Sequence, residues 1–93
     1  MKHYNITISG KVHEVFYRRS TFEIAQQLGL KGFVRNERNG NVYIESEETP
    51  VQLNTLLKWC GKEPSRAEVE DVKFTTGEMK FFEFFEIYRF TSI

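Results

Sequence analysis

The chain has 93 residues and a mass of 11.0 kDa, so we expect a single domain over residues 1–93. Its composition, with 40% hydrophobic and 28% charged residues, is ordinary for a globular protein. Thirteen Lys and Arg residues balance thirteen Asp and Glu residues, and this net charge of zero argues against a nucleic-acid partner and an electrostatic membrane anchor. The one cysteine excludes an internal disulfide, and the lack of a signal-peptide pattern or of an apolar run of ~18 residues favours a cytoplasmic location without a membrane partner.

The first third of the chain alternates between strand-like and helix-like patterns. Residues 3–9 alternate apolar and polar side chains, which is typical of a half-buried strand. Apolar residues then recur at helical spacing over residues 22–28, and Gly29 is expected to end that helix. Residues 31–36 predict a second strand directly after the helix.

The middle of the chain contains a hairpin signal and a helix start. Asn39-Gly40 favours a tight hairpin turn, which leads into a third strand through Val42 and Ile44. In the segment 49–52, Thr precedes Pro and Gln follows three residues after the Thr, which is the pattern of a capped helix start. One apolar face of that helix consists of Leu53, Leu56, Leu57 and Cys60.

Two further strands are predicted near the C-terminal end, over residues 69–74 and over the aromatic-rich residues 81–90. The resulting order is β-α-β-β-α-β with the fifth strand after it. This order predicts an α+β fold of the ferredoxin-like type, a sandwich with two helices on one face of a mainly antiparallel sheet. Many unrelated activities share this fold, so the function has to come from the residues of a site.

The junction between the first strand and the first helix is the best candidate for a site. Backbone N–H groups of residues 10–19 can point into a common concavity at a helix N-terminus, where the helix dipole favours an anion. Arg18 or Arg19 can bind the oxygens of a phosphate or carboxylate through the guanidinium fork. An arginine at a helix start is more often a solvated surface charge, so this pattern alone is a weak signal.

Three segments together resemble the acylphosphatase family. They read Gly10-x-Val12-x-x-Val15-x-x-Arg18, Leu28-Gly29-Leu30-x-Gly32-x-Val34-Arg35-Asn36 and Asn39-Gly40-x-Val42. In that family the first motif reads roughly G-[R/K]-V-Q-G-V-x-F-R. The resemblance continues to the terminal Phe85-Glu86-Ile87 and covers essentially the whole chain.

The resemblance implies a small hydrolase that cleaves carboxyl–phosphate mixed anhydrides to a carboxylate and phosphate, without a metal or cofactor. It implies two catalytic residues, Arg18 for the phosphoryl group and Asn36, whose side-chain amide holds the attacking water. The residues that the resemblance assigns to phosphate binding are Val12, His13, Glu14, Val15, Phe16, Tyr17 and Arg18. We expect a monomer whose small-molecule partner is an acyl phosphate or phosphate.

Two loop positions depart from the family motif: His13 replaces a glutamine and Glu14 replaces a glycine. A carboxylate about 5 Å from a phosphate charge is repelled by about 3 kcal/mol at an effective dielectric constant near 20. A position that needs a positive φ adds about 1–2 kcal/mol for any residue other than glycine. We therefore expect reduced phosphate affinity and activity, and the alternative is a catalytically weakened acylphosphatase-like domain that acts as an anion-binding or interaction module.

Other features have simpler interpretations. His3 and His13 are too few and too isolated for a metal site, and Cys60 is expected to be a buried packing residue. The C-terminal aromatic residues could form a stacking platform or a partner surface, but one face of that strand must fill the core. RNA-recognition domains share the predicted fold, yet the match to their aromatic motif stops after Lys31-Gly32-Phe33, and the zero net charge counts against RNA binding.

Overall fold

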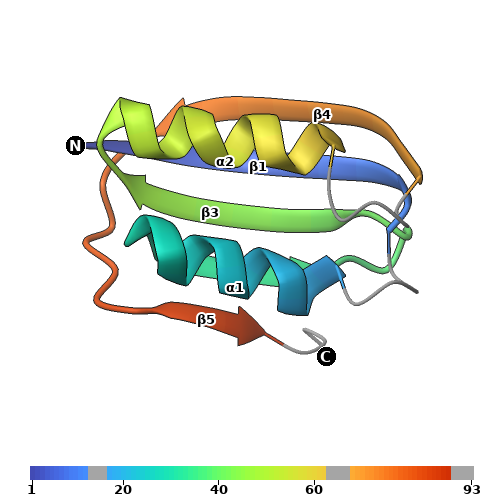
Figure 1. The fold of residues 1–93 in the computed structure, drawn as a ribbon, viewed down its shortest axis with the longest axis horizontal. Coiled ribbons are helices and arrows are strands. Elements are labelled where there is room, and N and C mark those ends of the chain that lie inside the picture. Colours follow the sequence, from blue (N-terminus) through green and yellow to red (C-terminus); the bar gives the residue numbers. More distant parts are fainter. Residues whose placement is uncertain (13–16, 63–67, 89–93) are drawn as a thin grey trace.

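The computed structural model describes residues 1–12, 17–62 and 68–88 (Figure 1). The elements of these residues follow one another as β1 (Lys2–Lys11), α1 (Tyr17–Leu28), β2 (Lys31–Asn36), β3 (Val42–Glu48), α2 (Pro50–Lys62), β4 (Glu68–Gly77) and β5 (Phe85–Tyr88).

The strands form one sheet in the order β4-β1-β3-β2-β5. Neighbouring strands are antiparallel except β2 and β5, which are parallel. Both helices cover the same face of the sheet, so the opposite face carries no helix among the described residues (Figure 1). The predicted ferredoxin-like α+β sandwich is confirmed.

The hydrophobic core fills the layer between the helices and the sheet. The alternation predicted for the first strand is confirmed, because Tyr4, Ile6 and Ile8 are buried. The other fully buried aliphatic core residues include Val34, Val42, Ile44, Leu53 and Leu56. Cys60 joins this core as predicted and is a free, buried thiol.

Local contacts explain where α2 begins. The Thr49 backbone N–H and hydroxyl both donate to Oε1 of Gln52, and the Thr49 carbonyl accepts from the backbone N–H of Leu53. The amide nitrogen of Gln52 donates to the carbonyl of Leu28 at 2.6 Å, which ties the start of α2 to the end of α1. The capped helix start that the sequence predicts is therefore confirmed.

The fifth strand is shorter than predicted. Sequence periodicity predicts a strand over residues 81–90, but β5 spans only Phe85–Tyr88, and residues 89–93 lie outside the described part of the chain. Phe81 has φ of 59°, a left-handed conformation that interrupts an extended strand. The backbone N–H groups of Lys80 and Phe82 donate to the carboxylate of Glu47, so these two groups bond to a side chain and not to a neighbouring strand.

Gly10 lies at the end of β1 where the chain approaches its neighbour closely. The register between β1 and β4 shifts between Ser9 and Gly10, and Gly10 has φ of 126°. A Cβ at this position would overlap the backbone carbonyl oxygen of Glu68. Only glycine fits this bulge, which directs the chain from β1 toward the connection with α1.

Candidate active site

The candidate site lies at the C-terminal end of the β2–β5 pair, next to the start of α1. The arrow of β5 in Figure 1 points toward the first turn of α1, and β2 runs in the same direction as β5. Helix α1 packs against both strands. A helix start, with its unpaired N–H groups, therefore faces the ends of two parallel strands.

Arg18 extends from the first turn of α1 to this end of the sheet. Its Nη1 donates a hydrogen bond of 3.0 Å to the backbone carbonyl of Tyr88, the last residue of β5. Tyr88 is the register partner of Arg35 in β2, and Asn36 follows Arg35 directly. The two residues predicted to be catalytic, Arg18 and Asn36, therefore come from different elements to the same end of the sheet.

Asn36 is the last residue of β2. Asn36 is two residues after Val34, and side chains two residues apart in a strand lie on the same face of the sheet. Because Val34 is buried in the core, the side chain of Asn36 lies on the face that α1 covers. Its Oδ1 is buried and accepts no hydrogen bond in the described part of the chain. Buried amide oxygens are nearly always hydrogen-bonded, which makes this acceptor unusual.

Val12 and Tyr17 belong to the predicted phosphate loop, and both are buried. The Tyr17 hydroxyl donates to the backbone carbonyl of Cys60 at 3.0 Å, and its ring packs against Trp59. Burial raises the pKa of the Tyr17 phenol above its usual range, with Cys60 contributing in the same direction. The side chain of Tyr17 thus belongs to the core, and its predicted role in phosphate binding concerns its backbone N–H.

The remaining residues of the predicted loop, His13, Glu14, Val15 and Phe16, lie outside the described residues. Their assignment to phosphate binding stays a prediction, as does the expected effect of Glu14.

Comparison with known proteins decides the family. The acylphosphatase family model matches residues 4–87. The chain belongs to the acylphosphatase family. It is 46% identical to the acylphosphatase of Marinobacter nauticus over 69 residues, which cover 74% of this chain and 75% of that protein. It is 43% identical to the acylphosphatase of Acaryochloris marina over 82 residues, 88% of each chain.

The fold agrees with this family. The crystal structure of acylphosphatase from Bacillus subtilis superimposes with a TM-score of 0.91 at 25% identity, covering 95% of this chain and 99% of that chain. The family and the class of enzyme predicted from the sequence, a hydrolase acting on acid anhydrides, are therefore confirmed.

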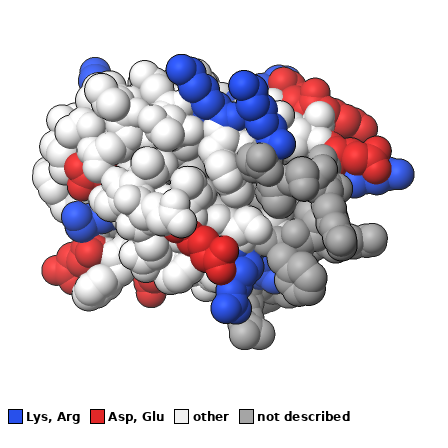
Figure 2. All heavy atoms as spheres, in the orientation of Figure 1, with Lys and Arg blue, Asp and Glu red and all other residues white. Residues whose placement is uncertain are grey.

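Two other arginines of this acylphosphatase family member pair with glutamates near them in the sequence. Arg19 is exposed and its guanidinium lies 3.7 Å from Glu23, which agrees with its interpretation as a solvated charge. Arg35 pairs with Glu37 at 2.8 Å, and its guanidinium lies over the ring of Tyr43. Figure 2 shows basic and acidic side chains scattered over the helix-covered face, without one broad basic patch in the part of the surface described.

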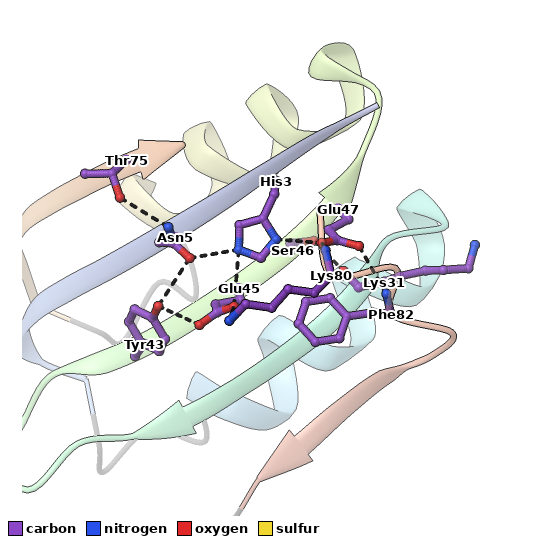
Figure 3. A network of polar contacts seen from close by, with 10 residues as sticks. All are labelled: His3, Asn5, Lys31, Tyr43, Glu45, Ser46, Glu47, Thr75, Lys80 and Phe82. Carbon is purple, nitrogen blue, oxygen red and sulfur yellow. Dashed lines mark hydrogen bonds and ion pairs between the residues drawn. The ribbon is translucent and has the colours of Figure 1, made fainter. Parts of the chain in front are cut away.

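A second polar cluster lies on the face of the sheet opposite the helices (Figure 3). The buried imidazole of His3 lies between two carboxylates of β3, with Nδ1 2.6 Å from Oε2 of Glu47 and Nε2 3.2 Å from Oε1 of Glu45. Lys80 Nζ donates to Oε1 of Glu45 at 2.8 Å, and Nε2 of His3 also lies 2.9 Å from Oδ1 of Asn5. The ring of His3 stacks on Phe82.

Hydrogen bonding controls the charge of these carboxylates. Burial raises the pKa of Glu47, but hydrogen bonds from the Lys80 backbone N–H and from His3 outweigh burial and hold the pKa below its ordinary value of 4.5. The pKa of Glu45 is likewise lowered, because hydrogen bonds from Lys80 and Tyr43 outweigh the effect of burial.

Sequence reasoning missed this cluster, because His3 and Glu47 are 44 residues apart and no local pattern pairs them. A groove of about 620 Å³ runs along the cluster.

In residues 1–12, 17–62 and 68–88, no group of three or more His, Cys, Asp and Glu side chains could hold a metal ion. No helix of these residues is long and apolar enough to cross a membrane.

Proposed function

We propose that this protein hydrolyses carboxyl–phosphate mixed anhydrides to a carboxylate and phosphate. In this proposal Arg18 and the backbone N–H groups of residues 13–18 bind the phosphoryl group, and Asn36 positions the attacking water. The observation that carries the proposal is that Arg18 and Asn36 come from α1 and β2 to one end of the sheet, at a helix start.

Arg18 has the chemistry that phosphoryl binding requires. Its present partner is a neutral carbonyl oxygen at a solvent-exposed position. A phosphoryl group offers charged oxygens, and hydrogen bonds to ionised acceptors are roughly twice as strong as neutral ones. The guanidinium fork can therefore exchange the Tyr88 carbonyl for two phosphoryl oxygens. The start of α1 adds N–H donors and the positive end of the helix dipole.

Asn36 supplies an acceptor for water. Its buried Oδ1 has bonding capacity that no described residue uses, and a water molecule can donate to it. The oxygen of that water forms the new bond to phosphorus while the bond from phosphorus to the acyl oxygen breaks. The carboxylate leaves with the bonding electron pair, and the proton of the water passes to solvent.

A covalent nucleophile is not part of this mechanism. An acyl phosphate already has a good leaving group, so positioning and charge stabilisation carry most of the catalysis. Cys60 is unsuited to attack, because burial raises the pKa of its thiol to about 12 and the residue lies in the core.

The test is hydrolysis of benzoyl phosphate in the presence of EDTA. We expect turnover by the wild type and its loss in Arg18→Ala and in Asn36→Ala. Arg19→Ala is the matched control, because it removes a neighbouring arginine whose guanidinium is exposed and faces Glu23, and it should keep wild-type activity. Turnover that survives both catalytic-site substitutions would refute the assignment of Arg18 and Asn36.

The remaining parts of the proposal are a reaction without a metal, a single domain over residues 1–93 and a monomer. Activity of these 93 residues with EDTA present would support the first two. Sedimentation of the active protein tests the monomer. Phosphate binding without any turnover would favour the anion-binding or interaction module instead. The cytoplasmic location predicted from the sequence belongs to this proposal as well.

A further inference from the structure

Two buried polar atoms of the described residues make no hydrogen bond, Oγ1 of Thr21 and Oδ1 of Asn36. Thr21 is 0% exposed and lies between Tyr17 and Ala25 on the buried stripe of α1. A buried hydroxyl without a partner lowers stability, because it has lost its hydrogen bonds to water. Packing alone therefore favours valine, which has the same shape, at position 21.

Thr55 in α2 shows what a helical threonine usually does. Its hydroxyl donates to the carbonyl of Val51, four residues earlier, at 2.9 Å. The equivalent acceptor for Thr21 is the carbonyl of Tyr17, and Thr21 does not use it. The Thr21 hydroxyl therefore keeps its full bonding capacity inside the layer between α1 and the sheet.

Thr21 and Asn36 belong to the same end of that layer. Thr21 follows Arg18 by three residues, so it lies on the same side of α1 and only ~4.5 Å further along the helix axis. Asn36 lies on the face of β2 that α1 covers, at the strand end toward which Arg18 extends. The two unbonded atoms thus belong to the layer in which α1 packs on β2, one on the helix side and one on the strand side.

We propose that Thr21 is a positioning residue of the hydrolytic site, whose hydroxyl oxygen holds the attacking water together with Oδ1 of Asn36. This inference rests on the proposed function. A water that donates one proton to each oxygen has both O–H bonds fixed, so its lone pairs face the phosphoryl group bound at Arg18. Such a role explains why a buried helix position carries a hydroxyl that bonds to no described residue.

The experiment compares Thr21→Val with Thr21→Ser and uses Thr55→Val as the matched control. For each variant, kcat and KM for benzoyl phosphate, the inhibition constant of inorganic phosphate and the midpoint of thermal unfolding are measured. We expect Thr21→Val to lower kcat about tenfold, the cost of one lost hydrogen bond, while KM and the inhibition constant stay within about twofold. Its unfolding midpoint should equal or exceed that of the wild type, and Thr21→Ser and Thr55→Val should keep kcat.

A purely structural role gives a different pattern. Wild-type kcat in Thr21→Val overturns the proposal, and so does a loss of kcat that Thr21→Ser fails to restore. If Thr21→Val does not fold, Thr21→Ala is measured with the same expected split between kcat and phosphate binding. An inactive wild type overturns the proposed function and this inference together, whereas an active wild type with an unaffected Thr21→Val overturns this inference alone.

Discussion

The guanidinium of Arg18, in the first turn of α1, donates a hydrogen bond of 3.0 Å to the backbone carbonyl of Tyr88 at the end of β5. These residues are 70 positions apart in the sequence. The bond brings a cation of the helix start to the strand end where Asn36 lies, and it leaves other N–H donors of the guanidinium for a ligand.

Arg18→Lys should raise the inhibition constant of inorganic phosphate about tenfold, because an ammonium keeps the charge but loses the planar fork that binds two oxygens at once. The measurement is inhibition of benzoyl phosphate hydrolysis by phosphate. Arg19→Lys serves as the control, since that guanidinium is exposed and faces Glu23. Equal inhibition constants for the two variants would show that the fork of Arg18 does not contact phosphate.

Glu14→Gly should lower the inhibition constant of phosphate markedly. The expected repulsion between a carboxylate and a phosphate about 5 Å away is about 3 kcal/mol at an effective dielectric constant near 20. Glu14→Gln separates the two possible causes, because it removes the charge but keeps the side chain. An effect of charge lowers the constant in both variants, and a backbone effect lowers it only in the glycine variant. An unchanged constant in both contradicts the prediction.

Glu47→Gln should destabilise the protein at pH 7 by about 1–3 kcal/mol, since the carboxylate accepts hydrogen bonds from His3 and from the backbone of Lys80 and Phe82. The pKa of Glu47 is lowered in the folded state, so its contribution is full above the ordinary value of 4.5 and is lost as the pH falls through the folded-state pKa. The free energy of unfolding in urea, measured from pH 7 to pH 3, should therefore decline below pH 4.5 in the wild type and decline less in the variant.

The control for this series is Glu23→Gln. The Glu23 side chain is 63% exposed, and its ion-pair partner within the described residues is the exposed Arg19. Its effect on the free energy of unfolding should stay within about 0.5 kcal/mol at every pH. Identical acid profiles for Glu47→Gln and the wild type would rule out Glu47 as a source of acid sensitivity.

Cys60 should react with thiol reagents only when the protein unfolds. Burial raises the pKa of its thiol to about 12, and the residue is fully buried. At pH 8 we expect labelling of the native protein to be at least about a thousandfold slower than labelling in urea, because it requires opening of the core. Leu56→Ala, which leaves a cavity in the same core, should accelerate native labelling. Native labelling at the rate seen in urea would place Cys60 at the surface.

Much of the fold could be predicted from the sequence because the signals are local. The alternation of Ile6 and Ile8 with polar residues and the capped start of α2 at Thr49 depend on neighbours within a few residues, and both are confirmed. The resemblance to acylphosphatases brought Arg18 and Asn36 forward as site residues, since a motif keeps residue types at fixed spacings. Their catalytic roles stay predictions until the variants are measured.

The tertiary structure decided what depends on distant contacts. Three of the residues 81–84 are aromatic and have strand propensity. The buried carboxylate of Glu47 nevertheless accepts from the N–H groups of Lys80 and Phe82, and the strand begins only at Phe85. Nothing in the neighbourhood of Thr21 indicates that its hydroxyl is buried without a partner. The sequence by itself determined the elements, their order and the family motif, because these rest on local periodicity and spacing. Only the tertiary structure showed three features: the shared end of α1, β2 and β5, the cluster of His3 with Glu47, and the burial of Thr21. These depend on hydrogen bonds and packing between residues tens of positions apart, which override local preference.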